Sequence, residues 1–122
     1  MGYLPVHLLY KSIPSEELTA LYTAADVCFV SSLRDGMNLV SYEYVACHNE
    51  VAMQSSRCDI PHGALVLSQF AGAADILDGS MLVDPWDADH CAETLAYAVS
   101  MTVDEAQTRM KRLGAMVEQY TR

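Results

Sequence analysis

A short run of polar residues carries the clearest chemistry of the chain. Arg34, Asp35, Asn38 and Glu43 place a guanidinium, a carboxylate, an amide and a second carboxylate around the flexible Gly36. The residues after this glycine have the pattern of a helix start, where backbone amides lack partners and the helix dipole is positive. Such a position suits a phosphate or diphosphate. Glu43 follows about one turn into the helix, where its carboxylate can accept hydrogen bonds from sugar hydroxyls.

A simpler interpretation of the same residues is also open. Asp35 can cap the helix, Gly36 can supply a left-handed turn and Glu43 can be a solvated side chain, since Asp and Gly commonly serve these purposes before helices. Spacing alone does not choose between a ligand site and a structural turn.

The elements that must position this run alternate between strands and helices. Apolar runs of strand length occupy residues 4–10, 26–30, 64–67 and 81–83, and helical spacing follows from Ser15, over 37–53, over 70–77, from Ala88 and from Thr102. We therefore expect an α/β fold, with a parallel sheet of about four strands flanked by helices. Ligands of such sheets bind beyond the carboxyl ends of the strands, which here indicates the loops at 31–36, 68–72 and 84–87.

Several helix starts have recognisable caps. Ser15 is expected to cap the first helix, and Asp84 and Asp87 are two possible caps ahead of the helix that starts at Ala88. Thr102 and Glu105 form a capping box, in which each side chain satisfies a backbone amide. The segment between 48 and 62 lacks a sustained period and is interpreted as a long exposed loop.

Composition narrows the class of protein. The chain has 16 acidic and 7 basic residues and a formal charge of −9, which argues against nucleic acid as the main partner because that binding depends on Lys and Arg. No apolar run approaches the roughly 18 to 20 residues that a spanning helix needs. We expect no membrane partner, and we expect a cytosolic location because the amino terminus lacks the pattern of a secretory signal.

Other conspicuous side chains are given structural interpretations. The four cysteines are expected to be reduced and mostly buried. Cys47, His48, Cys58 and His62 match no familiar zinc spacing, so we expect no metal there. We interpret Trp86 as a packing anchor, and the basic residues of the last helix, Arg109, Lys111 and Arg112, as a solvated face.

The polar run belongs to a longer recognisable string. Residues 33–43, LRDGMNLVSYE, followed by VAC at 45–47, closely resemble the donor-site signature of the trehalose-6-phosphate synthase family, the retaining glycosyltransferases of family 20. Further matches occur in the same order, at 17–18 and 25–27 upstream, then in LSQFAGAA at 67–74 and LVDPWD at 82–87. The resemblance covers nearly the whole chain.

The resemblance implies a fold and a donor site. The chain resembles part of the C-terminal Rossmann-like domain of a GT-B glycosyltransferase, which binds UDP-glucose. In the family, the carboxylate matching Asp35 contacts glucose hydroxyls, and main-chain groups of the matching stretch hold the glucosyl and diphosphate parts. The carboxylate matching Glu43 holds the ribose hydroxyls. The substrate-binding residues implied are Asp35, Gly36, Met37, Asn38, Leu39, Val40 and Glu43.

The resemblance also implies a reaction and its limits. The family transfers glucose from UDP-glucose to glucose 6-phosphate with retention, giving trehalose 6-phosphate and UDP, with no metal or other cofactor. The acceptor domain and the basic residues that hold the donor phosphates have no counterpart here, and residues 48–62 exceed the family's usual connection. We therefore expect a piece that is inactive alone. The alternatives are a noncatalytic nucleotide-sugar-binding or regulatory subunit of a synthase complex, and a generic nucleotide-binding domain, disfavoured because no GxGxxG string is present.

Overall fold

The structure is a computed structural model that describes residues 5–8, 12–33, 39–54, 63–75 and 77–120. At its centre is a three-stranded parallel sheet in the order β1-β2-β3, formed by β1 (Cys28–Val30), β2 (Leu65–Ser68) and β3 (Met81–Val83). Val30 pairs with Leu67, which pairs in turn with Leu82. The α/β class and the parallel sheet are confirmed.

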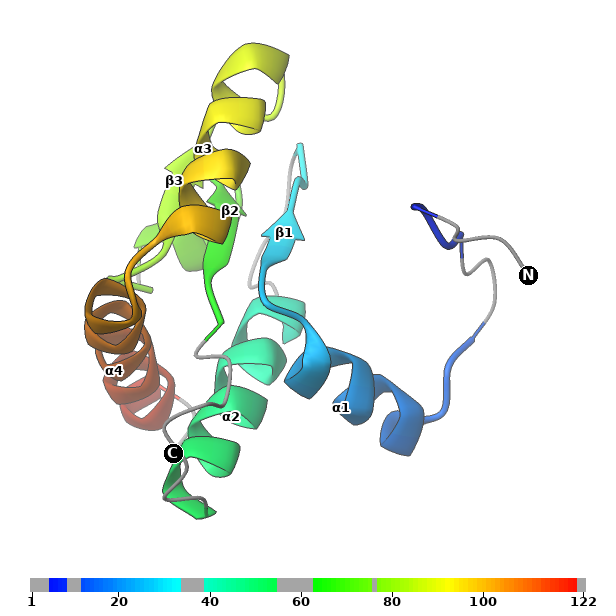
Figure 1. Cartoon of the computed structure of the whole chain (residues 1–122), viewed down its shortest axis with the longest axis vertical. Helices are drawn as coiled ribbons and strands as arrows, with labels where there is room; N and C mark the ends of the chain where they lie inside the picture. The colour runs from blue at the N-terminus through cyan, green and yellow to red at the C-terminus, as the bar shows by residue number, and fades with distance from the viewer. Residues whose placement is uncertain (1–4, 9–11, 34–38, 55–62, 76, 121–122) are drawn as a thin grey trace.

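Helices pack on both faces of this sheet (Figure 1). They are α1 (Ser15–Ala24), α2 (Leu39–Gln54), α3 (Ala88–Ser100) and α4 (Val103–Tyr120), with a short 3₁₀ helix, η1 (Gly72–Asp75), between β2 and β3. The segment expected to be helical over 70–77 is therefore shorter than predicted and of the tighter 3₁₀ form, with Gly72 at its start.

Alternation along β2 divides the core into two clusters. Leu65 and Leu67 point to the face that α1, α2 and α4 cover, where they pack with Tyr44 and Leu113. Val66 points to the opposite face, into a second cluster that α3 covers. All four residues of β2 are buried, as expected of a central parallel strand with a helix layer on each side.

The strand predicted over 4–10 is wrong for the part of it that the structure describes. Residues 5–8 form no strand, and Val6 and Leu8 are 79% and 85% exposed. In Figure 1 this segment lies apart from the sheet, beyond α1. An apolar run becomes a strand only where a neighbouring strand accepts its backbone hydrogen bonds, and the described residues supply no such neighbour here.

The structure settles the three predicted helix caps differently. Pro14, not Ser15, is the N-cap of α1, and no side chain caps this helix; Ser15 is its first helical residue. Asp87 caps α3 by accepting a hydrogen bond from the His90 amide at 3.0 Å. Half of the predicted capping box is present, because the Glu105 amide donates to the Thr102 hydroxyl at 3.2 Å.

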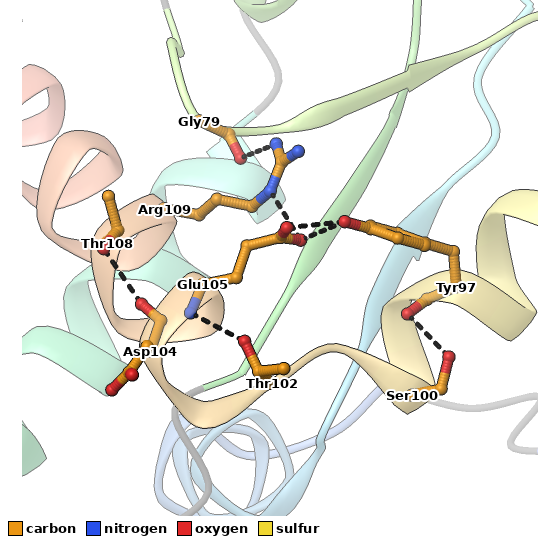
Figure 2. Close-up of polar contacts among 8 residues, drawn as sticks. All are labelled: Gly79, Tyr97, Ser100, Thr102, Asp104, Glu105, Thr108 and Arg109. Atoms are coloured by element: carbon orange, nitrogen blue, oxygen red, sulfur yellow. Dashed lines mark hydrogen bonds and ion pairs between the residues drawn. The ribbon is translucent and has the colours of Figure 1, made fainter.

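The carboxylate of Glu105 has a different task from the one that the capping box predicts (Figure 2). It accepts a hydrogen bond from the Tyr97 hydroxyl of α3 and forms an ion pair with Arg109, at 3.5 Å from Nε. Arg109 also donates to the carbonyl of Gly79 at 3.2 Å. Arg109 is therefore half-buried and ties α4 to the turn before β3, whereas Lys111 and Arg112 are exposed as predicted.

The first part of the long loop predicted over 48–62 is helical instead. Helix α2 continues through Gln54, so 48–54 are helical, in line with the helix predicted over 37–53, and residues 55–62 lie outside the described part of the chain.

Among the described residues, no helix is long and apolar enough to cross a bilayer.

Alkaline pH is expected to weaken the fold through Cys28. Burial raises the pKa of this thiol from 9.0 to about 11. The folded chain thus keeps the thiol protonated where the unfolded chain ionises it, so stability is intact below about pH 9 and falls as the pH rises through about 11. Thermal unfolding across this range should show a shallower decline for Cys28→Ala than for the wild type. Parallel declines in the two proteins would contradict the assignment.

Candidate functional site

The carboxyl edge of the sheet leads into α2, as the sequence predicts. β1 ends at Val30 and α2 begins at Leu39, so α2 follows the carboxyl end of an edge strand in the chain. Leu39 and Val40 are exposed in the first turn of α2. The other predicted substrate-binding residues of the loop, Asp35, Gly36, Met37 and Asn38, lie outside the described residues.

The first turn of α2 differs electrostatically from those of the other α-helices. The helix has no acidic residue there, whereas α1 has Glu16 and Glu17, α3 has Asp89, and α4 has Asp104 and Glu105. A carboxylate in the first turn neutralises the positive end of the helix dipole. In α2, as the structure describes it, no carboxylate of the first turn neutralises that end.

Glu43 projects from the exposed side of α2, about one turn beyond Leu39. Its Oε2 accepts a long hydrogen bond of 3.4 Å from the hydroxyl of Tyr22, a residue of α1. Both burial and the nearby Glu43 carboxylate raise the pKa of Tyr22, so this hydroxyl stays a donor. The sequence does not single out Tyr22, because spacing within one helix cannot reveal a contact with another.

Tyr22 is itself held by the buried side of α2. Nε2 of His48 lies 2.8 Å from the carbonyl oxygen of Tyr22, and the ring of Tyr44 meets the ring of Tyr22 edge to face, with centroids 6.3 Å apart. The Tyr44 hydroxyl donates to the carbonyl of Ala25 at 2.9 Å, just beyond α1. Burial raises the pKa of Tyr44 well above its usual value. The end of α1 is thus fixed against α2 by polar as well as apolar contacts.

Two of the four residues considered as zinc ligands, Cys47 and His48, lie in the described part of the chain. His48 is buried against Tyr22 and Tyr44. No group of three or more potential metal ligands occurs within the described part of the chain, and Cys58 and His62 lie outside it. Cys28 and Cys47 are partly buried, and Cys91 is buried.

The loops after β2 and β3 use their polar groups locally. The Ser68 hydroxyl accepts a hydrogen bond from the Phe70 amide at 3.1 Å, and Asp84 accepts one from the Trp86 amide at 3.0 Å. Trp86 is not the packing anchor that the sequence suggested, because its side chain is 73% exposed. The tight turn that Asp84 holds directs this side chain away from the described core.

Comparison with known proteins decides the family. The model of glycosyltransferase family 20 matches residues 1–122, the whole chain. The chain belongs to this family. A family 20 relative, the UDP-forming alpha,alpha-trehalose-phosphate synthase of Yarrowia lipolytica, is 43% identical over 119 residues. That match covers 98% of this chain but 23% of the relative, so the chain spans about a quarter of the length of such family 20 proteins.

Solved structures show the same fold. A UDP-forming alpha,alpha-trehalose-phosphate synthase from Burkholderia vietnamiensis is 38% identical with a TM-score of 0.82, and the match covers 96% of this chain and 25% of that one. The N-terminal domain of the Candida albicans trehalose-6-phosphate phosphatase is 30% identical with a TM-score of 0.79, and the match covers 90% of this chain and 21% of that one. This family 20 fold therefore occurs in proteins named for two different activities.

Proposed function

We propose that this chain is the UDP-glucose-binding part of a trehalose-6-phosphate synthase. The observation that carries the proposal is the position of Glu43, exposed one turn into the helix that follows the carboxyl end of β1 in the chain. In this assignment the Glu43 carboxylate accepts hydrogen bonds from the ribose hydroxyls. The diphosphate lies at the first turn of α2, where no carboxylate of the helix competes with it.

The remaining donor contacts fall to the loop before α2. We assign the glucose hydroxyls to Asp35, and the glucosyl and diphosphate groups to backbone amides along residues 36–40. Helix and loop amides stabilise the charge that develops on the departing UDP. We propose no metal and no other cofactor for this step. A cytosolic location likewise stays a prediction from the sequence.

Transfer itself requires an acceptor beside the donor. We propose glucose 6-phosphate as that acceptor, with trehalose 6-phosphate as the product and retention at the anomeric carbon. Because a glycosyl transfer depends on holding both substrates in one geometry, and the chain spans 23% of its synthase relative, we expect the 122 residues alone to give no trehalose 6-phosphate.

A noncatalytic role is the second candidate. The likeness to the N-terminal domain of a trehalose-6-phosphate phosphatase favours it, because that protein is named for a different reaction. In this case the chain binds a nucleotide sugar or associates with other synthase subunits without transferring glucose. A noncatalytic nucleotide-sugar-binding subunit would bind the donor just as the proposed synthase part does. A subunit that only associates with other synthase subunits would not.

Calorimetric titration of the purified chain with UDP and with UDP-glucose tests the proposal. We expect saturable binding of both ligands. We expect Glu43→Gln to lower the affinity for UDP about tenfold, because hydrogen bonds to a charged group contribute about 1.5 to 3 kcal/mol. Lys111→Gln is a matched control, since it removes a charge from the exposed face of α4. Undetectable binding by the wild type would leave only the association role.

A further inference from the structure

Glu43 and Tyr22 form a contact that the donor-site assignment leaves unexplained. Glu43 is exposed, and an exposed glutamate normally samples several rotamers. Here the Tyr22 hydroxyl donates to its Oε2 at 3.4 Å. Of the two carboxylate oxygens, this contact occupies one, so Oε1 can accept from a ligand while Oε2 is held.

The tyrosine that makes this contact is anchored independently of Glu43. Its backbone carbonyl lies 2.8 Å from Nε2 of the buried His48, and its ring packs edge to face on the buried Tyr44. Both anchors belong to α2, the helix that carries Glu43. The hydroxyl of Tyr22 is therefore placed by the same rigid element that presents the carboxylate.

We propose that Tyr22 is a positioning residue for the ribose-binding carboxylate of Glu43. The inference rests on the proposed function, because it takes the ribose diol as the ligand of Glu43. Restricting Glu43 before the ligand arrives lowers the ordering cost that binding would otherwise incur. Only ligands whose hydroxyls reach Glu43 gain from this restriction. A general contribution of Tyr22 to the fold would instead affect the binding of every ligand.

Titration of the purified chain with UDP and with 2′,3′-dideoxy-UDP provides the test. Tyr22→Phe keeps the ring and removes the hydroxyl. We expect it to lower the affinity for UDP about threefold and to leave the affinity for the dideoxy analogue unchanged. In a Glu43→Gln background the same substitution should have no further effect on UDP, because the two residues act through one interaction.

Tyr97→Phe is the matched control. It removes another tyrosine hydroxyl that donates to a carboxylate, that of Glu105, in the contact between α3 and α4 (Figure 2). We expect it to leave both affinities unchanged. Thermal unfolding of each variant identifies any loss that comes from the fold.

Each other outcome assigns the failure to one claim. Equal weakening of both ligands by Tyr22→Phe, or additive losses in the double variant, would overturn positioning and leave donor binding intact. No effect of Tyr22→Phe on UDP, with a clear loss in Glu43→Gln, would do the same. If Glu43→Gln itself leaves UDP binding unchanged, or the wild type binds no UDP, the donor-site assignment fails and the positioning role fails with it.

Discussion

Gly63→Ala is expected to lower the free energy of unfolding by about 2 to 5 kcal/mol. Gly63 has a φ of +72°, in the left-handed region that costs an alanine about 1 to 2 kcal/mol. A Cβ at this position would also lie 2.6 Å from the Tyr44 hydroxyl and 2.8 Å from Cε1 of His48. Overpacking of this kind adds about 1 to 3 kcal/mol.

Denaturant unfolding measures this effect, and Gly72→Ala is its control. Gly72 is exposed and has a helical backbone at the start of η1, so its substitution should change stability by less than about 0.5 kcal/mol. Because Tyr44 and His48 hold Tyr22, we also expect Gly63→Ala to weaken UDP binding. Equal stabilities of the two variants would show that the packing around Gly63 is looser than the structure indicates.

Leu67→Ala should cost about 2 to 5 kcal/mol of stability. Leu67 lies in the central strand with 0% of its surface exposed, and it faces the core cluster under α2 and α4. Removal of a buried leucine side chain loses its transfer free energy and leaves a cavity that the surrounding core fills only in part.

Leu82 offers a matched control for this substitution. It is the register partner of Leu67 on β3, and it is 46% exposed at the edge of the sheet. The same change, Leu82→Ala, should therefore cost less than half as much, since far less apolar area returns to water. If both variants unfold at the same denaturant concentration, the division into a buried central strand and an open edge strand is wrong.

Local patterns predicted most of the fold. The strand at 81–83 was confirmed, and Asp87, one of the two candidate caps, caps α3, because neighbouring residues in the chain decide both features. The run at 4–10 shows the limit of this reasoning. Its apolar residues are as suitable for a strand as those of β2, but pairing depends on a neighbouring strand that local sequence does not specify.

The candidate site divides in the same way. Glu43 could be selected from its place on a helix after a glycine and from the longer matching string, since both are properties of consecutive residues. Tyr22 and His48 could not, because their contacts join α1 to α2 across more than twenty positions. Likewise, the helical pattern predicts that Arg109 is a solvated base. Its hydrogen bond to the Gly79 carbonyl depends on a turn about thirty residues earlier, which the helical pattern does not include.

A crystal structure of the chain with bound UDP tests the central claim most directly. We predict that the ribose hydroxyls lie within hydrogen-bond distance of the Glu43 carboxylate and that the diphosphate lies at the first turn of α2. The Tyr22 hydroxyl should still contact Oε2. UDP bound elsewhere, or bound with its ribose turned away from Glu43, would contradict the assignment of the start of α2 as the donor site.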